Sequence, residues 1–203
     1  MNPFKLFVAT ICSLSTAFTS KPPQSIYNLS IKSISNETID LGQYKDKYIL
    51  FVNVASKCGF TKQYKDLQKL HETYKDRLVV IGSPCNQFGK QEPGNAKTIQ
   101  EFCSVNYSVS FPITEKIEVK GANQHPIYQW LTTKAANGSK DSSVKWNFQK
   151  YLVNPNGELV DFYYSTTNPL SNKITKYFNY DWHNYYIYFC FKLLTLRLFS
   201  CAL

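Results

Sequence analysis

Two nearly continuous apolar runs stand out along the chain. They are residues 48–56, YILFVNVAS, and residues 77–83, RLVVIGS. Runs of this kind, rich in β-branched residues, are typical of strands that are buried on both faces. Between them, apolar residues recur at helical spacing at Tyr64, Leu67, Leu70 and Tyr74. Thr61 stands where a helix cap is expected, so the pattern predicts a strand, a helix and a second strand.

The second half of the chain continues this alternation. The inner face of a further helix is marked by Ile99, Phe102 and Cys103. Pro126 favours the start of another helix, which is expected to end at Asn137 and Gly138. Residues 148–164, FQKYLVNPNGELVDFYY, predict two strands joined by a tight turn, followed by a terminal helix. The pattern predicts an α/β fold with a central mixed sheet flanked by helices, in a thioredoxin-like arrangement.

The composition divides the chain into three regions. Residues 1–20 combine Lys5, a short apolar run and small residues, which is the form of a secretory signal peptide. Its cleavage predicts a secreted or periplasmic protein, whereas a retained leader predicts a cytoplasmic one. Residues 21–178 have the texture of one globular domain. Residues 179–203 are aromatic and apolar, which fits a membrane anchor, a poorly ordered appendage or a non-native reading-frame extension.

The charge and the candidate metal ligands argue against two classes of function. The chain has 203 residues, a net charge of +9 and a pI near 9.2. Its basic residues are scattered, which is typical of a solvated surface and not of a nucleic-acid site. The six cysteines form no C-x-x-C pair and the three histidines lie far apart, so we expect no metal and no cofactor. A basic surface is compatible with transient contact with an anionic membrane surface.

Cys58 carries the strongest local signal for chemistry. It follows the first buried strand in NVASKCGFT and precedes a helix, so backbone N–H groups and the positive end of the helix dipole are expected nearby. Lys57 and Lys62 add positive potential, and Gly59 permits a tight turn that leaves the sulfur accessible. These surroundings favour thiolate, the form that attacks a peroxide oxygen and becomes sulfenic acid. The local sequence fits a buried structural cysteine equally well.

Three longer motifs favour the first reading. NVASKCGFT, PCNQFGKQEPG and VKWNFQKYLV occur in this order and together resemble the cysteine-containing form of the glutathione peroxidase family over residues 25–178. The resemblance implies a thioredoxin fold and the reduction of hydroperoxides to water or alcohols. It also implies catalytic roles for Cys58, Gln91, Trp146 and Asn147, with Cys58 at the peroxidatic position, where many relatives have selenocysteine.

The chemistry of these side chains suits the roles that the resemblance implies. Gln91 and Asn147 offer amide donors that can stabilise thiolate and polarise a peroxide. Trp146 offers an indole N–H and an apolar face that limits water near the sulfur. Without the resemblance, these residues would be read as a loop glutamine, a turn asparagine and a core tryptophan.

Two further cysteines fall within the resemblance. Cys103, in IQEFCSVNYSVSFP, matches the segment with the resolving cysteine in thioredoxin-dependent relatives. Its thiol would condense with oxidised Cys58, and a thioredoxin-type dithiol would reopen the disulfide, with glutathione as the other candidate reductant. Because Cys103 lies on the inner face of a predicted helix, that helix is expected to loosen before the sulfurs meet. A packing role is the alternative for Cys103 and the favoured reading for Cys85.

The chain also departs from the family pattern. Ser83 stands where a phenylalanine usually precedes PCNQF, and Phe162 stands where an arginine is common. The missing cation weakens the case for an anionic thiol such as glutathione and favours thioredoxin. The stretch between residues 129–140 and KWNF is short, as in monomeric relatives that accept bulky lipid hydroperoxides, so we expect a monomer.

These observations predict a thiol peroxidase that reduces hydrogen peroxide and organic or lipid hydroperoxides in oxidative-stress defence. The same residues would serve a peroxide-sensing relay in which oxidised Cys58 passes its oxidation to a partner protein. A third class is a non-catalytic, membrane-attached structural protein that uses the apolar ends of the chain.

Overall fold

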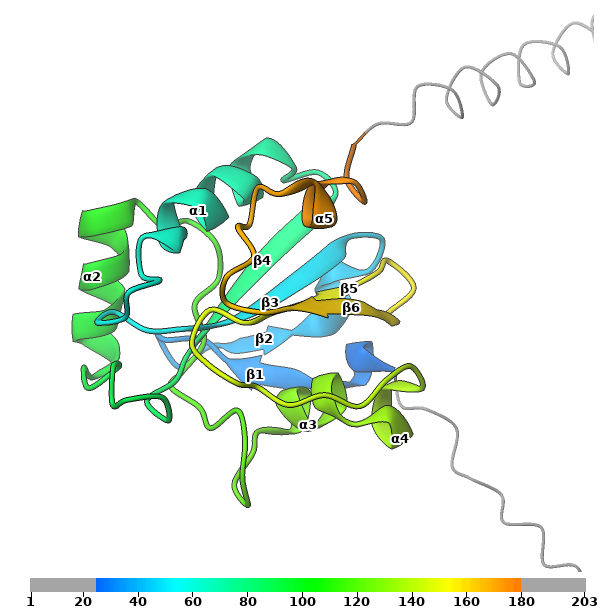
Figure 1. Ribbon diagram of the computed structural model, residues 1–203, viewed down its shortest axis with the longest axis horizontal. Coiled ribbons are helices and arrows are strands. Elements are labelled where there is room, and N and C mark those ends of the chain that lie inside the picture. Colours follow the sequence, from blue (N-terminus) through cyan, green and yellow to red (C-terminus); the bar gives the residue numbers. More distant parts are fainter. Residues whose placement is uncertain (1–24, 180–203) are drawn as a thin grey trace, which may run out of the picture.

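A four-stranded mixed sheet forms the centre of the computed structural model, which describes residues 25–179 (Figure 1). The strands are β3 (Tyr48–Val54), β4 (Leu78–Pro84), β5 (Lys150–Val153) and β6 (Leu159–Tyr163). They lie in the order β4-β3-β5-β6, with β3 parallel to β4 and the other two pairs antiparallel. Both apolar runs form the parallel strands and the expected hairpin is present, so the predicted mixed sheet is confirmed.

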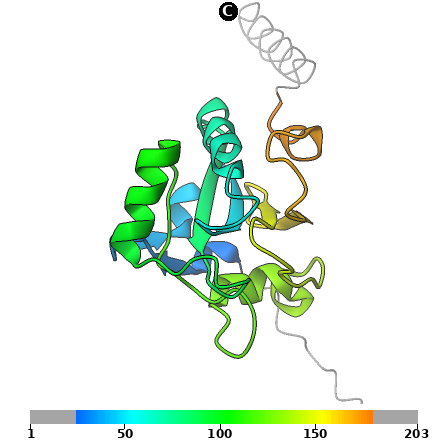
Figure 2. The same ribbon diagram turned by 60° about the vertical axis from the view of Figure 1, so that its left-hand side comes forward.

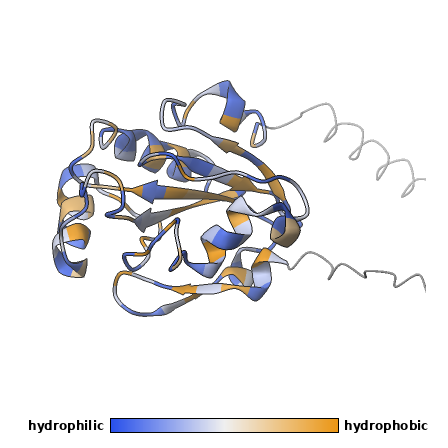
Figure 3. Cartoon of the chain, turned by 60° about the horizontal axis from the view of Figure 1, so that its bottom comes forward, coloured by the Kyte–Doolittle hydropathy of each residue, from blue (hydrophilic) through white to orange (hydrophobic). Residues whose placement is uncertain are grey.

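Helices cover both faces of this sheet (Figures 1 and 2). One face carries α1 (Gln63–Thr73), α2 (Ala96–Tyr107) and α5 (Asn172–Thr175), and the other carries α3 (Pro126–Thr132) and α4 (Lys134–Asn137). Side chains alternate along a strand, so Leu50 and Val52 pack towards α1 while Ile49 and Phe51 pack towards α3. Because both faces are covered, most residues of the central strands are apolar, and orange sections alternate with a few blue ones along them in Figure 3.

An N-terminal hairpin is absent from the predicted elements. β1 (Ser30–Lys32) and β2 (Thr38–Asp40) pair antiparallel, and short 3-10 turns lie at Ile26–Asn28 and Leu41–Tyr44. Each strand has three residues, of which only the middle one is buried. So short a segment gives the sequence too few alternating positions to reveal a strand. Ile31 and Ile39 extend the apolar core on the α3 side of the sheet.

The predicted helix limits have mixed outcomes. Pro126 is the first residue of α3, and Gly138 ends α4 with a left-handed φ of 73°, as expected. The helix is interrupted at Thr133, whose backbone is extended. The prediction that Thr61 caps α1 is wrong, because Lys62 holds that position and makes no side-chain cap within the described residues. The Thr61 hydroxyl is instead committed to the turn around Cys58.

The topology brings three distant segments to one edge of the sheet. Parallel β3 and β4 end together, with Val54 opposite Pro84. Antiparallel β5 begins at the same edge, with Lys150 opposite Val52. The segments that follow β3 and β4 therefore meet the segment that precedes β5.

The predicted leader at residues 1–20 lies outside the described residues, as does the predicted tail beyond Asn179. Both stay predictions. Within residues 25–179, every helix is too short or too polar to cross a membrane.

Candidate active site

Cys58 lies in a tight turn between β3 and α1. The Thr61 hydroxyl accepts a hydrogen bond from the Cys58 N–H at 2.9 Å and donates to the Ala55 carbonyl at 2.8 Å. The Cys58 carbonyl accepts from the Thr61 N–H at 3.0 Å, which closes the turn. The half-buried sulfur accepts from the backbone N–H of Phe60 at 3.4 Å. A backbone N–H group is therefore present beside the sulfur, as the sequence predicts.

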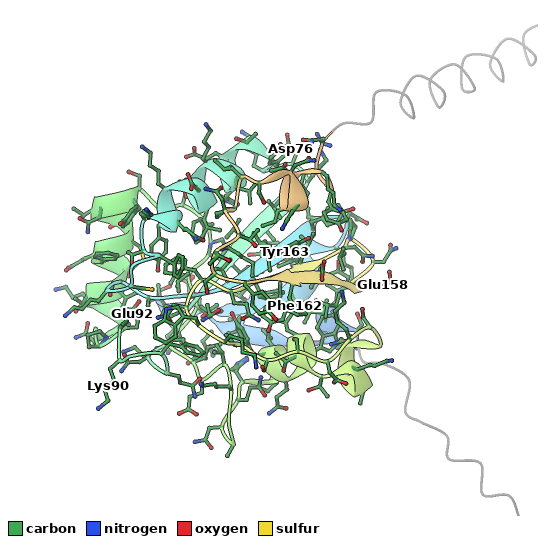
Figure 4. All side chains as sticks on the ribbon, viewed as in Figure 1. Asp76, Lys90, Glu92, Glu158, Phe162 and Tyr163 are labelled. Atoms are coloured by element: carbon green, nitrogen blue, oxygen red, sulfur yellow. The ribbon has the colours of Figure 1, made fainter. Side chains whose placement is uncertain are left out.

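The loop after β4 places Gln91 beside this turn. The Gln91 carbonyl accepts a hydrogen bond from the N–H of Lys57 at 3.0 Å, so Gln91 is joined to the residue before Cys58. Gly89 and Lys90 both have left-handed backbones, with φ of 64° and 53°. Two such residues in succession turn the chain sharply, and glycine adopts this conformation without steric penalty. Figure 4 shows Lys90 pointing away from the molecule, whereas Glu92 lies inside it.

Asn147 is buried against the Gln91 side chain. Its Nδ2 donates to the Gln91 Oε1 at 3.0 Å and to the Phe88 carbonyl at 3.4 Å. This bond fixes the orientation of the Gln91 amide, since the oxygen is held and the NH₂ end is left as the donor. Trp146 precedes Asn147 and has 40% of its surface exposed, with its ring centroid 5.9 Å from that of Phe88. The core-tryptophan reading is therefore wrong.

Asn53 supports this arrangement, and the sequence analysis did not single it out. Asn53 is fully buried in β3, where its Nδ2 donates to the Trp146 carbonyl at 3.0 Å. The backbone carbonyl of Asn53 accepts a hydrogen bond from the N–H of Phe148 at 2.6 Å. Phe148 has a φ of 64°, which is strained for a bulky residue and turns the chain between Asn147 and β5. A polar residue inside an otherwise apolar strand was the available signal.

Cys103 is buried, whereas Cys58 is only half-buried. Cys103 faces inward from α2 with 3% of its surface exposed, as predicted, beside the buried Tyr64. Burial raises the pKa of the Cys103 thiol to about 11, and the Glu92 carboxyl adds to this shift while Tyr64 opposes it. Cys103 belongs to the apolar cluster between the sheet and helices α1, α2 and α5, and Cys58 packs against the border of this cluster. Cys85 is fully buried in the cluster across the sheet, which fits its predicted packing role.

Cys103 makes stability sensitive to alkaline pH. The unfolded chain releases this proton near pH 9, whereas the folded protein holds it until about pH 11. The unfolded chain thus binds fewer protons in this window, and stability falls as pH rises through it. The loss attributable to Cys103 is roughly 2–3 kcal/mol over the full window. The free energy of unfolding is measured by urea titration for the native chain and for C103S across this pH window. An equal loss of stability in both chains would contradict the prediction.

The site chemistry is that of thiol, amide and indole groups. Within residues 25–179, no three His, Cys, Asp or Glu side chains are grouped so that they could hold a metal ion. The buried carboxyl nearest the site is Glu92, whose Oε1 accepts a hydrogen bond from the Ser56 hydroxyl. Burial raises the pKa of Glu92, and the hydrogen bond from Ser56 opposes the shift.

Comparison with known proteins identifies the family. Residues 26–132, more than half of the chain, match the family model for glutathione peroxidase. The chain belongs to the glutathione peroxidase family. It is 48% identical over 148 residues to glutathione peroxidase-like peroxiredoxin 2 of Saccharomyces cerevisiae, an alignment that covers 72% of this chain and 91% of the yeast protein. As a member of this family, the chain is a peroxidase that acts through cysteine.

Solved structures agree with this family and with the predicted fold. A crystal structure of Trgpx in its apo form is 37% identical, with a TM-score of 0.59, and the match covers 75% of this chain and 94% of Trgpx. A thiol:disulfide interchange protein of the thioredoxin family from Chlorobium tepidum is 13% identical, with a TM-score of 0.55 over 78% of this chain and 96% of that protein. The second likeness concerns the fold alone, and the predicted thioredoxin-like α/β fold is confirmed.

Proposed function

We propose that this glutathione peroxidase family member reduces hydroperoxides with Cys58 as the peroxidatic residue. The Cys58 thiolate attacks one peroxide oxygen, and the O–O bond breaks. The departing oxygen takes up a proton and leaves as water or an alcohol, while Cys58 becomes a sulfenic acid. The observation that carries the proposal is the hydrogen-bonded chain from Lys57 through Gln91 to Asn147, which assembles the site around the Cys58 turn.

Gln91, Asn147 and Trp146 serve this step in different ways. The Gln91 amide is oriented by Asn147, so its NH₂ end can donate to thiolate or peroxide without searching for a conformation. Asn147 is fully buried and acts chiefly by holding Gln91. The part-exposed Trp146 offers an indole N–H and shields the sulfur from bulk water.

Cys103 is the proposed resolving residue. Its thiol displaces the hydroxyl group of the Cys58 sulfenic acid, so an S–S bond forms and water leaves. A dithiol reductant then supplies two electrons and restores both thiols. Because Cys103 is buried on α2, the helix must open locally before the sulfurs reach bonding distance.

Two features support thioredoxin as the reductant and organic hydroperoxides among the substrates. Phe162, in place of the expected arginine, packs with its ring 5.9 Å from that of Tyr151, so the position offers no cation to glutathione. A cavity of about 180 Å³ beside the Cys58 turn can hold an alkyl group; it is lined by Ser56, Lys57, Pro93, Gly94, Thr98, Ile99 and Phe102. We also propose that the protein acts as a monomer.

The reductant assignment is tested by hydroperoxide-dependent NADPH consumption. The protein is coupled in turn to a thioredoxin system and to a glutathione system, each with hydrogen peroxide and with an organic hydroperoxide. Turnover with thioredoxin is expected to exceed turnover with glutathione at least about tenfold, a difference of about 1.4 kcal/mol in transition-state stabilisation. Robust glutathione turnover with inactive thioredoxin would overturn the assignment. The peroxidase names of the matched relatives favour this cycle over a sensing relay.

A further inference from the structure

Lys150, the first residue of β5, has its amino group in the interior of the protein. The residue is fully buried, although lysine is rarely found so. Its Nζ donates to the Gln63 Oε1 at 2.5 Å, to the Thr167 carbonyl at 2.7 Å and to the Ser165 carbonyl at 3.4 Å. These three oxygens match the three N–H donors of an ammonium group.

Burying an amino group carries a free-energy penalty that must be offset. Burial lowers the pKa of Lys150 to about 7, and the Asp66 carboxylate on α1 opposes the shift. An apolar residue of similar length would fill the same space without that penalty. The offset comes from the three hydrogen bonds of the amino group, so the segments that these bonds join are the next question.

The hydrogen bonds of Lys150 connect two parts of the proposed active site: the start of α1, which follows the Cys58 turn, and the segment that holds Asn147. Gln63 is the first residue of α1, directly after the Cys58 turn. Its Nε2 donates to the Ser165 carbonyl at 2.7 Å, so it contacts the same loop as Lys150. The Ser165 hydroxyl in turn donates to the Asn147 carbonyl at 2.5 Å. The result is a buried network, Gln63–Lys150–Ser165, that connects the start of α1 to Asn147.

We propose that Lys150 is a positioning residue for peroxide reduction. It fixes the loop at Ser165 against α1 and thereby holds Asn147, and through it the Gln91 amide, in register with Cys58. The inference rests on the proposed function, because it concerns the geometry of that reaction. Its physical basis is that a displacement of about 1 Å in a positioning group can lower a rate on the order of 100-fold.

The test compares Lys150→Met with a control of similar structural cost. Methionine keeps the length of the side chain and removes every donor. The control is Asn137→Ala, which removes a buried hydrogen-bonding side chain on the opposite face of the sheet, where Asn137 binds the Trp130 and Lys140 carbonyls. Both variants are measured at a temperature where thermal unfolding shows them to be folded.

The measured quantity is the second-order rate constant for oxidation of Cys58 by hydrogen peroxide, followed in a stopped-flow instrument. K150M is expected to lower it by about 10- to 100-fold, while N137A stays within about twofold of the native chain. Reduction of the preformed disulfide by thioredoxin should be unchanged in both variants. An unchanged oxidation rate in K150M, or an equal loss in N137A, would overturn the inference.

A second variant covers the case in which K150M does not fold. Ser165→Ala keeps the lysine and removes only the hydroxyl bond to the Asn147 carbonyl. It is expected to slow Cys58 oxidation several-fold, and an unchanged rate in S165A would then overturn the inference. A native chain that fails to react with peroxide would instead contradict the proposed function itself, so the two failures are distinguishable.

Discussion

Replacing Cys58 with serine is expected to abolish hydroperoxide turnover, with a loss of at least about 1,000-fold that reaches the background of the assay. The hydroxyl of serine does not ionise at neutral pH, and its oxygen is a far weaker nucleophile towards peroxide oxygen than a thiolate. The hydrogen bonds between Cys58 and Thr61 that close the turn use the backbone of Cys58, so the turn should persist in C58S. The assay is NADPH consumption coupled to either reductant, with a circular-dichroism spectrum to verify folding.

Cys85 provides the matched control for this experiment. It is another cysteine of the same chain, but it is buried in the apolar cluster on the other face of the sheet. C85A is therefore expected to keep most of the peroxidase activity at a temperature where it is folded. If C58S retains turnover, or if C85A rather than C58S loses it, the nucleophile has been assigned to the wrong sulfur.

Replacing Cys103 with serine should separate the two halves of the cycle. The first oxidation of Cys58 does not involve Cys103, so its rate constant should stay within about twofold of the native value. Thioredoxin-coupled turnover should fall at least about 100-fold, because no intramolecular disulfide can form for the dithiol to attack. Mass spectrometry after one equivalent of peroxide should detect a Cys58–Cys103 disulfide in the native chain and a trappable sulfenic acid in C103S.

The burial of Cys103 adds a kinetic expectation to this result. Its sulfur must leave the packed side of α2, where Tyr64 and Ile99 belong to the same apolar cluster, so disulfide formation should be slower than peroxide attack and should follow local opening of α2. Hydrogen exchange should then show faster exchange along α2 in the disulfide form than in the reduced form. Undiminished thioredoxin cycling in C103S would reject the resolving role and return Cys103 to the packing alternative.

Several features of this protein could be predicted from local sequence because their physical causes are local. Continuous apolar runs predict buried strands, since both faces of the sheet must be covered. Pro126 and Gly138 mark helix limits because their backbone preferences are intrinsic. The three motifs carry the family resemblance, and the family is confirmed by the family model over residues 26–132 and by the yeast relative that is 48% identical over 148 residues.

Local reasoning failed where a side chain had a competing partner. Thr61 has the chemistry of a helix cap, but its hydroxyl is taken by the Cys58 N–H and the Ala55 carbonyl. Trp146 could be read as a core residue, because its part-exposed place at the edge of the sheet depends on how β5 pairs with β3. The short β1–β2 hairpin is stabilised by contacts with the rest of the core, which the sequence does not display.

The sequence by itself determined the four strands of the central sheet, most helices, the family and the identities of the candidate catalytic groups. Only the tertiary structure decided how those groups meet. The antiparallel return of β5 brings Asn147 to Gln91, and the buried contacts of Asn53 and Lys150 hold that junction. Such contacts join residues 56 to 93 positions apart. They depend on strand order and packing, and local propensity and periodicity carry no information about either.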